Sequence, residues 1–159
     1  MSYVDVLFRS FAKNATICSY NEFLSLDSTV TKITVGSNCY GSRDRIAEWD
    51  LGRFLFLKEL VVGDESFDDV DLTIRGLDEL ESIVIGERSF RKGYGSLHLN
   101  SLPKLKELRT GCYAFSNYRV CDIGDVDALE VIEIGKVDNE TASFFYASLE
   151  LKSILIHIK

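Results

Sequence analysis

The chain has 159 residues, a formal net charge of -7 and an apolar share of 46%. This composition is typical of a folded domain and excludes intrinsic disorder. The negative charge disfavours nucleic acids and anionic membranes as partners, because both attract basic surfaces. The chain contains no apolar run of about 18 residues that could span a membrane and no signal peptide pattern. We therefore expect a cytoplasmic protein whose four cysteines, which show no C-x-x-C spacing, are reduced thiols.

Residues 1–29 are predicted to form an N-terminal cap. Apolar residues recur there at intervals of three and four, which predicts a short amphipathic helix from Ser2 to Lys13. These residues are Tyr3, Val4, Leu7, Phe8 and Phe11. A stack of strands needs such a cap, because its terminal coil otherwise exposes the core. The rest of the segment is expected to form a degenerate first coil, and a free tail is the alternative interpretation.

Residues 30–159 contain five copies of a pattern of the form L-x-x-I-x-I-G, of which Leu80–Gly86 is the clearest. The glycines that close the copies are Gly36, Gly63, Gly86, Gly111 and Gly135, at intervals of 27, 23, 25 and 24 residues. A period of this size is typical of a solenoid. The alternating apolar residues predict a strand. The glycine after each strand is expected to turn the chain sharply with a positive φ.

Each copy continues with an aromatic residue and a second apolar piece. The aromatic stands four positions after the glycine in four copies, as Tyr40, Phe67, Phe90 and Phe115. The second piece predicts a second strand, and its first apolar column is Trp49, Leu72, Leu97, Cys121 and Leu149. Stacked turns are expected to build two parallel sheets with the aromatic residues between them. Cys121 is expected in the core, and Cys112 is expected to be exposed.

The run L-x-x-L-x-L-x-x-x-x-F, with a period near 24, resembles leucine-rich repeats over residues 30 to about 154. The forms Val62–Phe67 and Ile85–Phe90 look most like the BspA-like branch of that family. The asparagine of many leucine-rich repeats appears only as Asn38, so no asparagine ladder is expected. The resemblance implies a mainly β, leucine-rich-repeat-like solenoid of about five turns. It also implies a protein-binding scaffold that performs no catalysis.

No catalytic, metal or cofactor site is predicted. His98 and His157 each lie between apolar residues of alternating strands, so both side chains are expected to face solvent. Five carboxylates crowd the turn after Gly63, but their spacing does not match a calcium-binding loop, and a solvated acidic turn is the preferred interpretation. No nucleophile, base and orienting acid can be assembled. We therefore expect a protein that is not an enzyme.

Outward-facing positions of the first strand of each copy form two rows, which are the predicted partner-binding surface. One row contains Thr34, Val61, Val84, Arg109 and Glu133, and its neighbour contains Lys32, Glu59, Ser82, Glu107 and Val131. Adjacent Val61 and Val84 with charged neighbours resemble a small hydrophobic centre with a polar rim. The alternative is that valine simply suits a strand. This surface predicts a binding module for a protein partner of unknown identity.

The segment Ser153–Lys159 is a second candidate for interaction. It is apolar, has no recognisable cap and carries Ile154, Ile156 and Ile158. An uncovered strand edge tends to pair with another chain. The alternative function is therefore a structural protein that forms a homodimer or filament through this edge. A third reading is that the edge continues into a longer repeat array.

Overall fold

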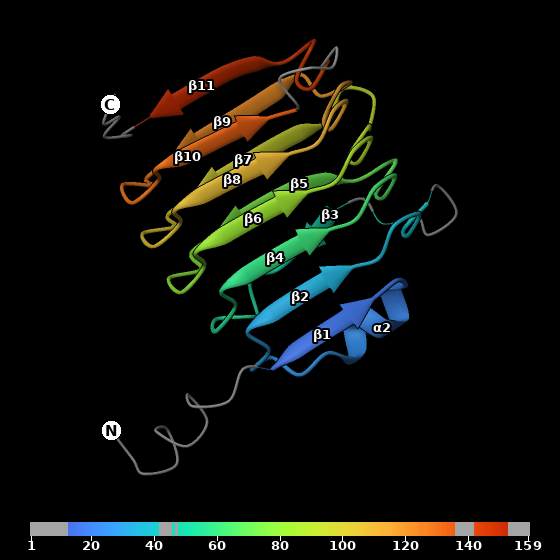
Figure 1. Cartoon of the computed structure of the whole chain (residues 1–159), viewed down its shortest axis with the longest axis vertical. Helices are drawn as coiled ribbons and strands as arrows, with labels where there is room; N and C mark the ends of the chain where they lie inside the picture. The colour runs from blue at the N-terminus through green and yellow to red at the C-terminus, as the bar shows by residue number, and fades with distance from the viewer. Residues whose placement is uncertain (1–12, 42–45, 47, 136–141, 153–159) are drawn as a thin grey trace.

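The computed structural model describes residues 13–41, 46, 48–135 and 142–152. It is a mainly β solenoid of about four turns, in which all paired strands are parallel and two sheets face each other (Figure 1). The predicted parallel solenoid is confirmed. The predicted count of five turns is not confirmed, because residues 136–141 of the fifth copy lie outside the described residues.

Each complete turn contributes one strand to each sheet. Sheet A has the order β1-β2-β4-β6-β8-β10, and sheet B has the order β11-β9-β7-β5-β3. The strands of sheet A are β1 (Asn14–Ile17), β2 (Lys32–Val35), β4 (Glu59–Val62), β6 (Ser82–Ile85), β8 (Glu107–Thr110) and β10 (Val131–Ile134). The strands of sheet B are β3 (Glu48–Asp50), β5 (Asp71–Arg75), β7 (Ser96–Asn100), β9 (Val120–Gly124) and β11 (Ser148–Lys152).

The core lies between the sheets, because alternate residues of each strand point inward. The inward row of sheet A joins Ile33, Leu60, Ile83, Leu108 and Ile132 in register. The first four are at most 2% exposed. In sheet B the predicted column from Trp49 to Leu149 is also in register. Burial of the members of these rows from β2 to β9 is the main stabilising contribution, about 25 cal/mol per Å² of apolar area.

A column of stacked aromatic rings runs along the solenoid axis. Its members are Tyr40, Phe67, Phe90, Phe115 and Phe144, and successive ring centroids lie 4.5, 4.7, 5.2 and 5.0 Å apart. Stacked aromatic pairs add about 0.5–1.5 kcal/mol each beyond their buried area. The last turn lacks an aromatic at the expected spacing, yet Phe144 continues the column.

In the turns after the strands of sheet A, most repeat glycines do not have the positive φ that the sequence predicted. Gly63 and Gly86 do not have a positive φ; the left-handed residues of these turns are instead non-glycine, such as Glu65 at 54° and Phe67 at 59°. A Cβ atom on Gly86 would lie 2.5 Å from the carbonyl carbon of Gly63 in the preceding turn. Glycine is therefore required for close stacking of backbones. Of the five repeat glycines, Gly135 does have a positive φ, of 70°.

Buried serines connect the same turns. The Ser89 hydroxyl donates a hydrogen bond to the Gly63 carbonyl at 2.9 Å and accepts one from the Ser66 amide at 3.1 Å. Ser66 donates in the same way to Gly36 at 2.9 Å and accepts from the Cys39 amide at 3.2 Å. Both serines are 0% exposed. Their hydroxyls replace hydrogen bonds that water would otherwise make, which explains serine before the aromatic residue.

The first described segment extends sheet A into the predicted cap. β1 pairs with β2 in parallel, and the helix α2 (Tyr20–Ser25) follows. Ser19 and Glu22 form a capping box that satisfies free amides at the helix start. The helix predicted between Ser2 and Lys13 lies almost entirely outside the described residues. Within the described part of the chain, no helix has the length and apolar character needed to cross a bilayer.

Candidate interaction surface

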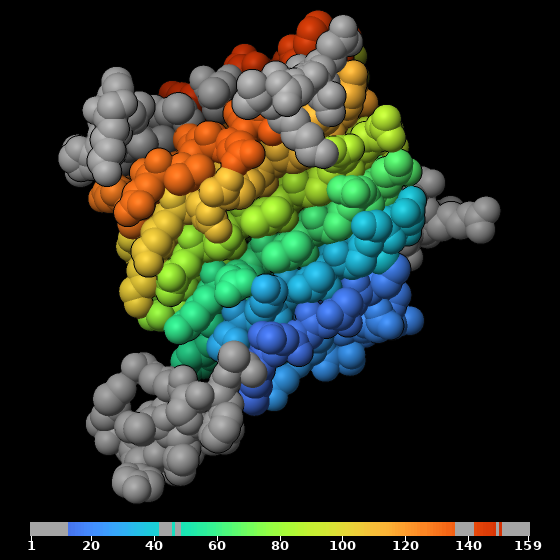
Figure 2. All heavy atoms as spheres, viewed as in Figure 1, coloured from blue at the N-terminus to red at the C-terminus, as the bar shows by residue number. Residues whose placement is uncertain are grey.

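The parallel register places the two predicted rows on the outer face of sheet A. Adjacent residues in the first row are Thr34, Val61, Val84, Arg109 and Glu133. Adjacent residues in the second row are Lys32, Glu59, Ser82, Glu107 and Val131. The strands of sheet A lie as successive bands across this face (Figure 2). All of these side chains are at least partly exposed, so the rows are available to a partner.

Val61 and Val84 form the apolar centre of this face. They are direct neighbours on β4 and β6, and both side chains are half-buried. Neighbouring strands in a sheet lie about 4.8 Å apart, so the two side chains are close enough to present one continuous apolar surface. A partner that lies across β4 and β6 would contact both valines at once.

Three charged residues and a serine form a network at one side of the valines. Arg109 Nε donates to Glu107 at 3.0 Å, and Arg109 Nη1 donates to Glu133 on the next strand. Glu107 also accepts a hydrogen bond from the Ser82 hydroxyl at 2.7 Å. The Ser82 hydroxyl and then Arg109 hold the pKa of Glu107 below its usual value, because both favour the ionised form. Glu107 and Glu133 in turn raise the pKa of Arg109.

Lys32 and Glu59 form an ion pair of 2.7 Å on the other side of the valines. The charged rim of the surface is therefore paired within itself. Exposed pairs of this kind contribute little to stability, about 0–1 kcal/mol each. Their pairing leaves the apolar centre as the main source of binding energy and makes the rim a guide for orientation.

The predicted self-association residues Ile154, Ile156 and Ile158 lie outside the described residues. The described edge of sheet A at that end is β10. Its inward residues Ile132 and Ile134 are 40% and 39% exposed, whereas Ile83 on β6 is 1% exposed. No strand of the described chain follows β10 in sheet A. Among the described residues, this edge therefore presents apolar side chains and a strand that pairs only with β8.

The other side chains that were considered for catalysis or metal binding lie on the solvent-facing side of their elements. His98 Nδ1 lies 3.6 Å from Asp122 Oδ2 in the next strand of sheet B, and His157 lies outside the described residues. Carboxylates of the acidic turn pair with basic residues one turn later, as Asp68 does with Arg91 at 3.0 Å. In the described ranges no group of three or more histidine, cysteine or acidic residues could hold a metal ion.

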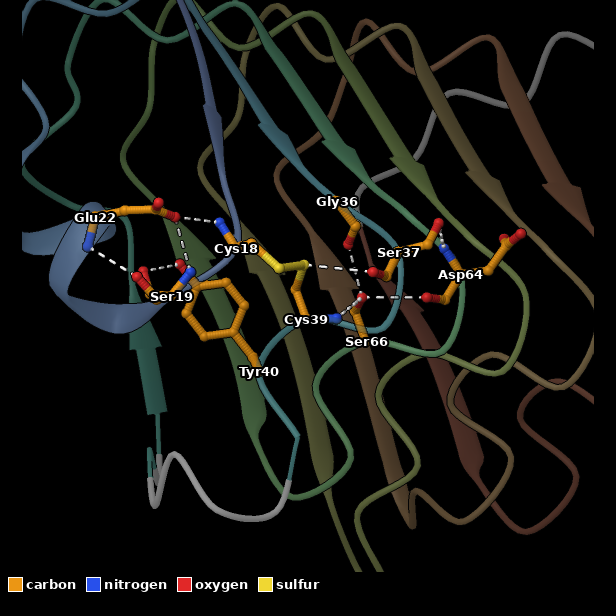
Figure 3. Close-up of a disulfide and its surroundings, with 9 residues drawn as sticks. All are labelled: Cys18, Ser19, Glu22, Gly36, Ser37, Cys39, Tyr40, Asp64 and Ser66. Atoms are coloured by element: carbon orange, nitrogen blue, oxygen red, sulfur yellow. Dashed lines mark hydrogen bonds between the residues drawn. A yellow bond between two sulfur atoms is a disulfide. The ribbon is translucent and has the colours of Figure 1, made fainter.

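A disulfide between Cys18 and Cys39 was not predicted. Its Cα atoms lie 4.9 Å apart, and it connects the end of β1 to the turn after β2 (Figure 3). Around it the Tyr40 hydroxyl donates to the Ser19 carbonyl at 2.7 Å. The expectation of four reduced thiols is therefore wrong for this pair. The register of β1 against β2, which pairs Ile17 with Val35, brings the two cysteines together.

The remaining cysteines are free and buried. Cys121 lies in the core as predicted, at 1% exposure. The expectation that Cys112 is exposed is wrong, since it is 4% exposed. The next turn packs over this position, as the hydrogen bond of 2.9 Å from the Ser143 hydroxyl to the Gly111 carbonyl indicates.

Comparison of the chain with known proteins finds no matching family model, no matching curated protein and no matching solved structure. The assignment of an interaction surface therefore depends on the repeat register and on the side chains that the register aligns.

Proposed function

We propose that the chain is a non-catalytic protein-binding module that presents the outer face of sheet A to a protein partner. The observation that supports this most is the pair of half-buried valines, Val61 and Val84, at the centre of a rim of paired charges. Complete burial of such valines by a partner would contribute about 1 kcal/mol each. Solenoids commonly use extended sheet faces of this kind for binding.

We also propose that the repeats are leucine-rich repeats of the BspA-like branch, with five glycine-marked copies. The support is the L-x-x-I-x-I-G strand, the parallel stacking of successive copies and the Ser-Phe pair in the turns. The partner on this proposal is a protein, since the acidic surface disfavours nucleic acids and anionic membranes.

The disulfide between Cys18 and Cys39 bears on the cellular location of the protein. The cytoplasmic location expected from the sequence stays a prediction, and this disulfide disfavours it. A disulfide is typical of oxidising compartments and rare in the cytosol. A count of free thiols in protein taken from its native source distinguishes the two: four for a reduced chain, and two if this pair is bonded.

A capture experiment tests the proposed function. The immobilised chain and its Val84→Glu variant are exposed to extract of the source cells, and the retained proteins are quantified by mass spectrometry. Thr73→Glu is the matched control, because Thr73 holds an outward position in the middle of sheet B. The proposal expects a partner that is lost with Val84→Glu and kept with Thr73→Glu. Identical retention by all three proteins would overturn it.

Self-association is the second candidate function. The supporting observation is the exposure of Ile132 and Ile134 at the edge of sheet A, where equivalent positions in earlier turns are buried. An apolar edge strand pairs readily with the edge of another sheet, so one copy could extend the stack of the next.

A further inference from the structure

A second exposed cluster lies away from the outer face of sheet A, in the turns where the chain passes from sheet A to sheet B. It contains Tyr94, Arg119 and Tyr146, from the turns that precede β7, β9 and β11. The guanidinium carbon of Arg119 lies 4.9 Å from the centroid of the Tyr94 ring and 5.2 Å from that of Tyr146. We call these three residues the Tyr-Arg-Tyr column.

Backbone hydrogen bonds between successive turns fix the column in place. The Arg119 amide donates to the Gly95 carbonyl at 2.8 Å, and the Ser148 amide donates to the Arg119 carbonyl at 2.9 Å. The backbone positions from which the three side chains project are thus fixed relative to one another by the stacking of the turns.

The aromatic rings of the column are exposed to solvent and are not part of the core. Tyr94 is 80% exposed and Tyr146 is 54% exposed. Phe145 is 68% exposed, and its ring packs edge-on against Tyr146 at 4.9 Å. Tyrosine and arginine are enriched among the residues that dominate binding energy at protein interfaces. Three such side chains, with the exposed Phe145 beside them, therefore indicate a binding site.

The charge of Arg119 distinguishes it from neighbouring cations. On the same edge Arg91 pairs with Asp68 at 3.0 Å, and Lys92 pairs with Asp71 at 2.6 Å. Arg119 forms no ion pair with any residue in the described part of the chain; its contacts there are the two rings and its backbone hydrogen bonds. Rings on the faces of a guanidinium leave its in-plane N–H groups free to bind an anion.

The chemistry of the free N–H groups matches a carboxylate. A guanidinium binds a carboxylate through two parallel hydrogen bonds in its own plane. Arg119 carries one positive charge, which suits one carboxylate better than a doubly charged phosphate. The flanking aromatic surface then suits an apolar side chain next to the carboxylate.

We propose that the Tyr-Arg-Tyr column, together with Phe145, is a docking site for a peptide segment that carries an aspartate or glutamate beside an apolar residue. The carboxylate accepts hydrogen bonds from Arg119, and the apolar side chain packs against Tyr94 or Phe145. This site is separate from the outer face of sheet A. It does not depend on the function proposed for that face.

An NMR titration tests this site with two synthetic peptides. One alternates glutamate and phenylalanine, and the other alternates glutamine and phenylalanine. At 17.9 kDa the full chain is suited to this method. The proposal expects the glutamate peptide to shift the Arg119 Nε–H signal and to bind about tenfold or more tightly than the glutamine peptide, because a charged hydrogen bond is lost in the latter.

Two variants complete the test. Arg119→Gln should remove the preference for the glutamate peptide. Arg88→Gln should keep it, since Arg88 is an exposed arginine that is paired with Glu65. Thermal melting of both variants checks that the fold is intact. Equal binding of the two peptides, unchanged preference in Arg119→Gln, or no shift at Arg119 with either peptide would each overturn the proposal.

Discussion

The disulfide between Cys18 and Cys39 joins the segment before the first repeat to the first repeat turn, across 21 residues of sequence. The same region is held by the hydrogen bond from Tyr40 to Ser19 and by the pairing of β1 with β2. The covalent bond therefore restrains the end of the stack. A terminal coil is the part of a solenoid with the fewest neighbours and the greatest tendency to open.

We predict that Cys18→Ser lowers the free energy of unfolding by about 3 kcal/mol, the value expected for a closed loop of this length. Cys18 is exposed, so the substitution removes little packing. Denaturant titration measures the change. Reducing agent should lower the stability of the parent chain by a similar amount and leave Cys18→Ser unaffected. A variant as stable as the oxidised parent would show that the bond does not restrain the fold.

We predict that the fold loses stability at alkaline pH. Burial, followed by Asp122, raises the pKa of the Cys121 thiol from 9.0 to about 12. Burial also raises the pKa of the Tyr118 hydroxyl. Between pH 9 and pH 12 the unfolded thiol has lost its proton while the folded thiol keeps it. The unfolded state then binds fewer protons, so the free energy of unfolding falls as pH rises, by up to about 1.4 kcal/mol per pH unit for each such group.

Urea titrations at a series of pH values measure this slope, and Cys121→Ala provides the comparison. The variant loses some packing at every pH, but its stability should decline less steeply between pH 9 and pH 12. A thiol reagent such as Ellman's reagent should react with Cys121 only when the chain unfolds, because the thiolate is the reactive form. Parallel slopes in parent and variant would contradict the raised pKa.

We predict that Gly86→Ala disrupts the stacking of the central turns. The added Cβ would meet the Gly63 carbonyl carbon at 2.5 Å and the Asp64 amide nitrogen at 2.6 Å, and backbone atoms cannot move aside as a side chain can. Overpacking of this kind costs about 1–3 kcal/mol or more. Gly93→Ala is the control, since a Cβ there meets nothing within 4 Å. Melting temperatures compare the two, and an equal effect would exclude close stacking as the reason for glycine.

The strands were predictable because their signal is local. Alternation of Ile83 and Ile85 with polar or outward residues identifies β6 without knowledge of its neighbours. The parallel sheets then follow from the repeat period. The outer rows of sheet A were predictable for the same reason, since equal spacing in each copy aligns Val61 with Val84.

Features that depend on contacts between turns could not be predicted. The sequence of a single repeat does not show that Gly86 packs against the turn of Gly63. The prediction that the glycine has a positive φ was therefore wrong. The disulfide depends on how β1 pairs with β2, and β1 has no glycine-marked pattern. Tyr94 and Tyr146 are distant in sequence, and only the stacking of turns brings both rings to Arg119.

The exposed residues Ile132 and Ile134 at the edge of sheet A are expected to bind a second copy of the chain. If a second copy covers Ile132 and Ile134, then the molar mass measured by light scattering should rise with protein concentration. Replacing both residues by lysine should keep the chain monomeric, because it places charges on the apolar edge and edge charges oppose strand pairing. Both are already about two-fifths exposed, at 40% and 39%, so the variant should remain folded.

Leu55→Lys is the control for that experiment, since Leu55 is 58% exposed and lies in the turn before β4, far along the stack from β10. Leu55→Lys also replaces an apolar residue by lysine, but it leaves Ile132 and Ile134 unchanged. Association should therefore persist in this variant. A parent chain that stays monomeric over the whole concentration series would exclude self-association. The interaction would then have to come from a different protein, bound at the Val61 and Val84 face or at the Tyr-Arg-Tyr column.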